Sequence, residues 1–281
     1  MLRVAVPNKG SLSEPAATML REAGYRQRRD GRELVLIDAD NDTEFFFLRP
    51  RDIATYVGSG QLDVGITGRD LLLDSDAAAE EILGLNFGRS TFRYAALPEA
   101  ATSIEEFAGK RVATSYGGLV RRDLAQRGID AEVVHLDGAV ETAVRLGVAD
   151  VVADVVETGA TLRQAGLELV GEPLLLSEAV LIRRHGTDPV PQVEQLVRRL
   201  NGVIIARQYV MIDYDIRKEY LEAAAELTPG IESPTVSPLQ DPAWVAVRAM
   251  VRRRETNRIM DELWELGAKG ILVTDILACR L

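Results

Sequence analysis

The segment from Val151 to Leu162 constrains the fold more than any other part of the chain. It opens with Val151–Val156, an apolar and mostly β-branched run interrupted only by Asp154, which is the pattern of an inner strand of a parallel sheet. Gly159 then lets the backbone approach a ligand closely, and a helix from about Thr161 would direct free N–H groups at an anion in the turn. The sequence therefore predicts a phosphate-binding turn at the end of a buried strand.

A bare Thr-Gly-x-Thr fragment also occurs in ordinary polar turns, and this remains the alternative interpretation. The position of Asp154 favours a ligand, because an ionised carboxylate is costly to bury unless it is paired. A ribose 5-phosphate has a diol at one end and a phosphate at the other. It fits Asp154 or Glu157 together with the turn at Gly159.

Composition describes an ordinary water-soluble globular protein with room for two or three domains. The chain has 281 residues, of which 47% are hydrophobic and 27% charged. No apolar run is long enough for a membrane span, and the first residues lead directly into a strand, so we expect neither membrane insertion nor secretion. A single cysteine, Cys279, and two histidines exclude a disulfide framework and a zinc-type cluster. The expected compartment is the cytoplasm.

The net charge of −10 opposes a general affinity for nucleic acid, which depends on Lys and Arg neutralising phosphates. A small anion needs only local basic residues, and several of these lie beside glycine or proline. They are Lys9 before Gly10, Arg49 and Arg51 around a proline, and Arg69 after a glycine. A solvated surface charge is the alternative for each, and it fits Arg51 better than Lys9.

Strand and helix patterns alternate over the first 176 residues or so, which predicts parallel sheets with helices on both faces. The first unit of this kind is a strand over Leu2–Val6, a loop with Lys9, and a helix whose possible capping box is Ser11 with Glu14. Ligands of open α/β sheets bind at the carboxyl ends of strands. Lys9 and the Gly159 turn each follow the carboxyl end of a predicted strand, so both are placed to contact a ligand. We expect two lobes, the second opening at Arg93.

The tail from Tyr209 follows a different order, strand, helix, two strands, helix, strand. This β-α-β-β-α-β order defines a ferredoxin-like unit, and about 70 residues suffice for such a domain. The expected elements are strands over 209–214, 234–237, 244–250 and 270–277, with helices over 216–226 and 254–266. We place the boundary near Gln208.

A longer pattern around the predicted phosphate turn resembles a known family. The run Glu141-x5-Gly147-x-Ala149-x2-Val152-x-Asp154-Val155-x2-Thr158-Gly159-x-Thr161-Leu162 is similar to the signature of the ATP phosphoribosyltransferases. The resemblance covers essentially the whole chain and includes Asn8-Lys9-Gly10, Leu48-Arg49-Pro50-Arg51-Asp52-Ile53, Gly65-Ile66-Thr67-Gly68-Arg69-Asp70 and Arg111-Val112-Ala113-Thr114-Ser115-Tyr116. The tail, with Thr228-Pro229-Gly230 and residues 233–238, resembles the C-terminal regulatory domain of the long form.

The resemblance implies an α/β fold with a two-lobed, periplasmic-binding-protein-like (type II) catalytic core. A ferredoxin-like (ACT-like) α+β domain follows it. The expected boundaries are 1–92 and 178–208 for the first lobe, 93–177 for the second lobe with the phosphate loop, and 209–281 for the regulatory domain.

The implied reaction joins N1 of the ATP adenine to C1 of the ribose of phosphoribosyl pyrophosphate and releases pyrophosphate. It is the first step of histidine biosynthesis. The expected contacts to phosphoribosyl pyrophosphate are Asp154, Glu157, Thr158, Gly159, Ala160, Thr161 and Leu162, and those to ATP or pyrophosphate are Lys9, Gly10, Arg49, Asp70 and Tyr116. Lys9, Asp154 and Glu141 are the expected catalytic residues, with Mg²⁺ as the cofactor, held mainly by the substrate pyrophosphate.

Two positions depart from the family pattern. Ser11 stands where the family commonly has arginine, and Gly117 stands where it commonly has proline. The phosphate contact of that arginine would then pass to Lys9 or Arg49.

Simpler roles remain open for three of the expected site residues. Asp70 also suits a helix N-cap, Tyr116 also suits packing at a strand exit, and Glu141 also suits the surface of an amphipathic helix.

The resemblance of the tail implies feedback inhibition by histidine and a homo-oligomer, from dimer to hexamer. Asp215 is the expected contact for the amino group of histidine, with Thr235 and Thr274 adding polar contacts. Without the resemblance, an N-cap role for Asp215 and turn roles for the two threonines fit equally.

Two other classes compete with the enzyme. Two α/β lobes also describe a small-anion binding or sensing protein without catalysis, although neither a signal peptide nor a basic helix-turn-helix is evident. A non-catalytic relative is the second alternative, and only Ser11 favours it.

Overall fold

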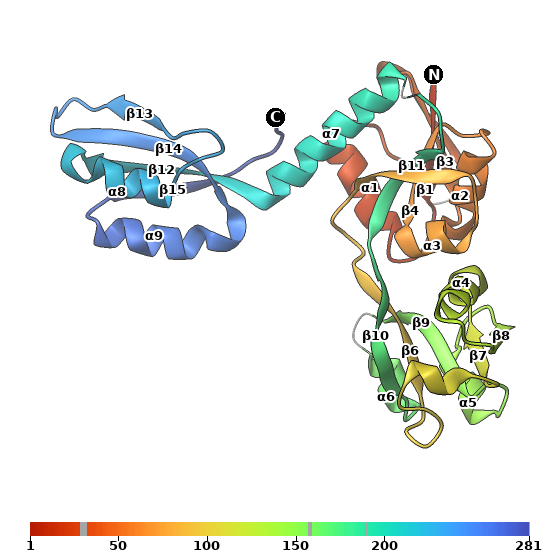
Figure 1. Ribbon diagram of the computed structural model, residues 1–281. Helices are drawn as coiled ribbons and strands as arrows, with labels where there is room; N and C mark the ends of the chain where they lie inside the picture. The colour runs from red at the N-terminus through yellow and green to blue at the C-terminus, as the bar shows by residue number, and fades with distance from the viewer. Residues whose placement is uncertain (29–32, 157–158, 189, 281) are drawn as a thin grey trace. The chain divides into compact units, whose positions relative to one another are not determined.

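The structure is a computed structural model that describes residues 1–28, 33–156, 159–188 and 190–280. Its contacts divide the chain into two compact units, Met1–Arg21 with Tyr25–Val193, and Glu22–Gly24 with Glu194–Leu281 (Figure 1). The sequence placed residues 194–208 in the first lobe. These contacts instead group them with the C-terminal part of the chain.

The first sheet has six strands in the order β2-β3-β1-β4-β11-β5. Its strands are β1 (Leu2–Pro7), β2 (Val35–Asp38), β3 (Thr43–Leu48), β4 (Val64–Gly68), β5 (Ala79–Gly84) and β11 (Ala179–Arg184). The helices of this lobe are α1 (Ser13–Glu22), α2 (Pro50–Gly58), α3 (Arg69–Asp74) and the short η1 (Ala39–Asn41). Pro50 begins α2, because its fixed φ suits the first helical position and its missing N–H costs nothing there.

The second sheet has five strands in the order β10-β6-β9-β7-β8. Its strands are β6 (Ser90–Ala96), β7 (Arg111–Thr114), β8 (Glu132–His135), β9 (Val151–Val156) and β10 (Glu168–Ser177). Its helices are η2 (Ile104–Phe107), α4 (Gly117–Arg127), α5 (Glu141–Arg145) and α6 (Ala160–Gln164). The chain leaves the first sheet after β5 and returns from β10 to β11, so the first lobe is built from two separate stretches of sequence.

Both sheets are mixed, which corrects the expectation of parallel sheets. In the first, β1 runs parallel to β3 and β4, whereas β11 is antiparallel to β4 and β5. In the second, β9 is parallel to β7 but antiparallel to β6. The connections between the two sheets reverse the direction of the chain, so some strands pair antiparallel. This reversal cannot be predicted from the spacing of strands and helices along the sequence.

The second unit has the predicted β-α-β-β-α-β order after one long helix. That helix is α7 (Pro191–Gln208), and the module comprises β12 (Tyr209–Arg217), η3 (Lys218–Tyr220), α8 (Leu221–Leu227), β13 (Thr235–Pro238), β14 (Trp244–Arg252), η4 (Arg253–Glu255), α9 (Thr256–Glu265) and β15 (Lys269–Asp275). The sheet order β13-β14-β12-β15 is that of a ferredoxin-like unit. Ile216 belongs to β12, so the predicted helix over 216–226 begins too early.

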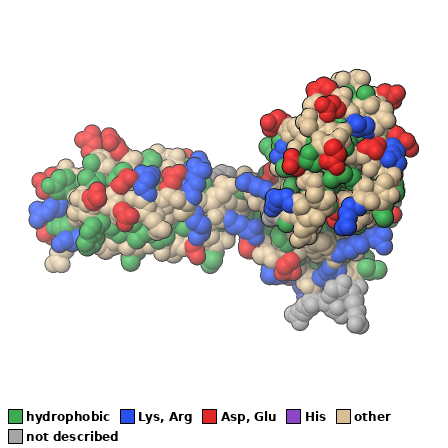
Figure 2. Space-filling model, turned by 90° about the horizontal axis from the view of Figure 1, so that it is seen from below, with side chains coloured by type: hydrophobic (Ala, Val, Ile, Leu, Met, Phe, Trp, Pro, Cys, Tyr) green, Lys and Arg blue, Asp and Glu red, His purple; other side chains and the backbone are tan. Residues whose placement is uncertain are grey.

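Alternating burial along β12 and β14 explains why α8 and α9 cover one face of this sheet. Ile212, Tyr214 and Ile216 are buried and pack with residues of α8 and α9, while the alternate residues form the open face of the sheet. No helix in the described part of the chain combines the length and apolar character needed to cross a membrane. In the face seen in Figure 2, acidic and basic side chains are interspersed over the surface.

Candidate active site

The predicted phosphate turn lines a cavity of about 270 Å³ at the end of β9, called the phosphate cavity below. Gly159 has a φ of 69°, the left-handed conformation that glycine adopts most readily, and α6 begins directly after it. The lining residues are Glu141, Asp154, Val155, Val156, Gly159, Ala160, Thr161 and Leu162. The first backbone N–H groups of a helix have no partner within it, so this turn offers donors to an anion. Glu157 and Thr158 lie outside the described residues.

Asp154 lines this cavity, and its charge is only partly balanced by its neighbours. Burial raises the pKa of its carboxyl, and the negative charges of Glu141 and Asp70 raise it further. The backbone N–H of Val155 donates to its Oδ1 at 2.8 Å, and this bond and Arg51 act in the opposite direction. A group in this position favours a ligand that donates hydrogen bonds, as the hydroxyls of a ribose do.

Arg93 pairs with Asp154 across the β6–β9 ladder, although the sequence predicted no site role for it. Its Nη2 donates to the carbonyl of Gly171 at 2.6 Å, whereas its buried Nε has no hydrogen-bond partner among the described residues. Only the strand pairing reveals this neighbour, because the two residues are far apart in sequence.

A second cavity, of about 170 Å³, is lined by residues from both lobes and is called the inter-lobe cavity below. Its lining residues are Lys9, Gly10, Ser11, Leu12, Pro50, Gly68, Asp70, Leu71, Gly88, Ser90, Tyr116 and Val155. Four of the five residues predicted to contact ATP or pyrophosphate therefore lie around one space. Arg49 is the fifth, and it is exposed at the N-cap of α2 and does not line this cavity.

Asp70 is held in the inter-lobe cavity by Ser177. The hydroxyl of Ser177 donates to Asp70 Oδ1 at 2.9 Å and accepts from the Asp70 backbone N–H at 3.1 Å. The N-cap of α3 is Gly68, so Asp70 is not the helix cap that the sequence also allowed. A Cβ at Gly68 would collide with the Asp70 carboxylate. Ser177 is a further residue that sequence reasoning missed, since β10 brings it here from 107 positions away.

Tyr116 is largely buried between charged groups. Burial raises the pKa of its hydroxyl, and the carboxylate of Asp70 adds to the rise. The guanidinium of Arg51 lies over the ring, with Cζ 4.8 Å from the centroid, and Phe92 packs edge-on at 5.1 Å. Tyr116 thus packs against its neighbours and also borders the cavity, and its contact with ATP stays a prediction.

Asp74, at the end of α3, joins the two lobes by contacting the start of α4. Its Oδ1 accepts from the backbone N–H groups of Gly118 and Leu119 at 2.8 and 3.0 Å, and its Oδ2 pairs with Arg51 at 2.9 Å. A carboxylate of the first lobe therefore caps the N-terminus of α4 in the second. Gly118 permits this contact, because a Cβ there would collide with the Asp74 carbonyl.

Arg69 has a structural role. It donates to Glu81 and Glu178 and to the carbonyl of Leu176, and the hydrogen bond to Glu81 is the main cause that raises its pKa above the ordinary arginine value. Its charge is balanced by the protein, unlike that expected of a phosphate ligand.

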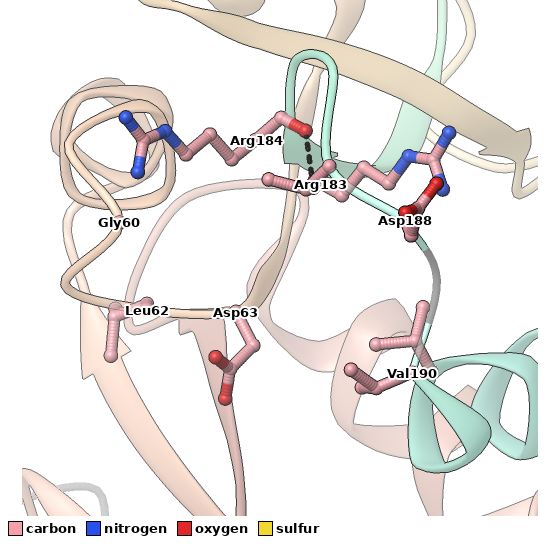
Figure 3. Close-up of a pocket in the computed structure, with 9 residues that line it drawn as sticks. Gly60, Leu62, Asp63, Arg183, Arg184, Asp188 and Val190 are labelled. Carbon is pink, nitrogen blue, oxygen red and sulfur yellow. Dashed lines mark hydrogen bonds between the residues drawn. The ribbon is translucent and has the colours of Figure 1, made fainter.

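A third cavity, of about 250 Å³, lies on the first unit among residues that the sequence did not single out (Figure 3). Arg183 and Arg184 line it, but their side chains extend in opposite directions, the first toward Asp188 and the second toward Gly60. Arg183 also donates through Nε to Glu80 at 2.7 Å. The two guanidinium groups therefore do not converge on one ligand position.

The three residues predicted to bind histidine share the open face of the C-terminal sheet. Asp215 is inside β12 opposite Ala246, Thr235 is on β13, and Thr274 on β15 pairs with Met211. Because Asp215 belongs to a strand, it does not cap a helix, and neither threonine belongs to a turn.

Comparison with known proteins identifies the family. A family model described as ATP phosphoribosyltransferase matches residues 49–202, more than half of the chain. The chain belongs to the ATP phosphoribosyltransferase family. A second model, described as the HisG C-terminal domain, matches residues 206–278.

Similar proteins over the full length bear the same name. The ATP phosphoribosyltransferase of Arthrobacter sp. (strain FB24) is 68% identical and that of Streptomyces coelicolor 65% identical, and each alignment covers 100% of both chains. A chain of the ATP phosphoribosyl transferase (HisG:HisZ) complex from Thermotoga maritima matches with a TM-score of 0.64 and 26% identity, covering 73% of this chain and 98% of that one. Membership makes the chain a pentosyltransferase that condenses ATP with phosphoribosyl pyrophosphate in the first step of histidine biosynthesis, and the non-catalytic alternative is not favoured.

Proposed function

We propose that phosphoribosyl pyrophosphate and ATP meet at Val155 during phosphoribosyl transfer. Val155 lines both the phosphate cavity and the inter-lobe cavity, so the two spaces adjoin at the end of β9. This shared residue is the observation that carries the assignment, because the reacting ribose carbon and adenine nitrogen must come into contact.

The 5-phosphate binds against the backbone of Gly159 to Leu162, with the Thr161 hydroxyl as an added donor. Each charge-assisted hydrogen bond contributes about 1.5–3 kcal/mol, and this remote binding energy orients the ribose. Asp154 accepts hydrogen bonds from the ribose hydroxyls, which offsets the burial and the nearby negative charges that raise its pKa.

ATP occupies the inter-lobe cavity with Lys9, Gly10, Asp70 and Tyr116. The adenine nitrogen is already a neutral nucleophile, so the protein needs to position it rather than deprotonate it before attack. Negative charge grows on the leaving pyrophosphate, and Lys9 stabilises it there, with Arg49 as a second cation. Glu141, on the phosphate cavity, accepts a proton from the product.

Mg²⁺ would bind at this site mainly through the phosphates of the substrate. No group of three or more His, Cys, Asp or Glu suited to a metal occurs in the described part of the chain. Mg²⁺ is commonly bound through substrate phosphates with few protein ligands, and it would neutralise charge on the pyrophosphate.

The C-terminal module binds histidine on its open sheet face through Asp215, Thr235 and Thr274, and thereby inhibits the enzyme. A coupling of about 1–3 kcal/mol between the two sites is sufficient for strong inhibition. A closed homo-oligomer, from dimer to hexamer, follows if the histidine site spans subunits. Asp215→Asn should abolish inhibition without changing uninhibited turnover, and unchanged inhibition would place the histidine site elsewhere.

The assay for the reaction follows the absorbance of N1-substituted adenine with ATP, phosphoribosyl pyrophosphate, Mg²⁺ and pyrophosphatase. Well-folded protein should form product, and Thr161→Ala should weaken use of phosphoribosyl pyrophosphate far more than affinity for ATP. An unchanged Michaelis constant and turnover in that variant would reduce the turn to a structural element.

A further inference from the structure

A cavity of about 510 Å³ in the second unit is lined by six residues, four of them arginines. They are Arg207, Gln208, Tyr209, Arg252, Arg253 and Arg254, which come from the end of α7, the start of β12, the end of β14 and η4. Among the residues that the structure describes, no carboxylate belongs to this lining, although the whole chain has a net charge of −10. Like charges gathered around one space repel, so an anion between them would be stabilised.

The surrounding carboxylates use only part of the donor capacity of these arginines. Arg207 pairs through Nε with Glu22 at 2.8 Å, Arg253 through Nη1 with Asp275 at 2.8 Å, and Arg254 through Nε with Glu255 at 3.2 Å. A guanidinium carries five N–H donors in a planar fork, so each of these groups keeps donors for a second partner.

Tyr209 gives the cavity an apolar face. It pairs with Arg252 across the β12–β14 ladder, and the Arg252 Cζ lies 5.9 Å from the centroid of its half-buried ring. Arginine binds phosphate through two parallel hydrogen bonds and stacks on aromatic rings, and a cavity of this volume accommodates a drug-sized molecule.

We propose that this arginine cavity is a second anion-binding site, for a multiply phosphorylated small molecule of nucleotide size. It lies in the C-terminal unit, whereas the two cavities assigned to the reaction lie in the first. It shares no lining residue with either of them.

The test is a binding titration of the full chain with GTP and, separately, with pyrophosphate. We expect saturable binding of both that weakens as salt rises and falls at least about 10-fold in Arg252→Gln/Arg254→Gln. The control Arg198→Gln removes an exposed arginine of α7 outside the cavity and should bind as the wild type does. Arg252→Lys/Arg254→Lys keeps both charges but loses the planar guanidinium donors. Its affinity for each probe should therefore lie between that of the wild type and that of the double glutamine variant.

Four results would overturn the proposal. One is the absence of saturable binding to the wild type, and another is equal affinity in the double glutamine variant with unchanged circular dichroism and Tm. Loss of binding in Lys9→Gln instead would place the probe in the reaction site. A smaller sedimenting species in the unliganded double variant would make the cavity an interface between copies of the chain.

Discussion

The two cavities of the first unit differ in how the sequence encodes them. The phosphate cavity takes most of its lining from one stretch, Asp154 to Leu162, with Glu141 from the preceding helix. The inter-lobe cavity takes its lining from at least five stretches between Lys9 and Val155. The proposed 5-phosphate site therefore depends mainly on a local turn, whereas the proposed ATP site depends on how the lobes are joined.

The largest effect should come from Asp154→Asn, which removes the acceptor charge beside the ribose. We expect kcat/KM for phosphoribosyl pyrophosphate to fall about 100-fold, the order of loss that misplacement of a reacting group causes. ATP affinity, measured by titration, should change little. Asp137→Asn is the matched control, because its side chain is fully exposed in the same lobe. Equal losses of affinity for both substrates would erase the distinction between the cavities.

Ser177→Ala tests the inter-lobe cavity alone. It leaves the buried Asp70 carboxylate without its hydroxyl donor, at a cost of about 1–3 kcal/mol, so KM for ATP should rise about 10-fold. Phosphoribosyl pyrophosphate affinity should stay constant, and Ser177→Thr should restore most of the ATP affinity. A variant that loses stability with no change in either KM would limit Ser177 to a structural role.

Asp74→Ala breaks one contact between the lobes, that of Asp74 with the start of α4. The loss of a helix cap together with its Arg51 ion pair should lower the free energy of unfolding by about 1–2 kcal/mol, measured by urea denaturation. Asp76→Asn is the control, since Asp76 also reaches the second lobe but through an exposed ion pair with Arg122, and such pairs contribute about 0–1 kcal/mol. Asparagine tolerates the positive φ of 51° at this position. Only the Asp74 variant should also raise KM for ATP, and identical behaviour of both variants would contradict the role of Asp74 in joining the lobes.

The smallest effect concerns pH and stability. Burial, together with Glu141 and Asp70, raises the pKa of Asp154 in the folded state above its ordinary value of 3.8, while Arg51 and the Val155 N–H oppose the rise. Above the folded pKa the ionised carboxyl destabilises the fold. As the pH falls through that value the group becomes protonated and the cost disappears. Asp154→Asn should therefore have a higher Tm than the wild type at pH 7, and the difference should shrink toward zero below pH 3.8. A lower Tm for the variant at pH 7 would show that Asp154 stabilises the apo fold.

Local order was predictable wherever neighbouring residues decide it. The end of β9, the turn at Gly159 and the β-α-β-β-α-β order of the tail follow from apolar periodicity, glycine conformation and element order. The helix expected at Ile216 was wrong because pairing with β14 extends β12 to Arg217.

Contacts between distant segments required the tertiary structure. No local sequence pattern predicts the hydrogen bond from Ser177 to Asp70 or the capping of α4 by Asp74. The pairing of Arg93 with Asp154 is equally invisible to local patterns. The sequence by itself determined the family, the two-lobed α/β core and the turn at Gly159, because short-range periodicity and a contiguous motif encode them. Only the tertiary structure decided which side chains complete the inter-lobe cavity and which arginines converge in the C-terminal unit. Those groups meet through strand pairing and chain reversal, which spacing along the sequence does not express.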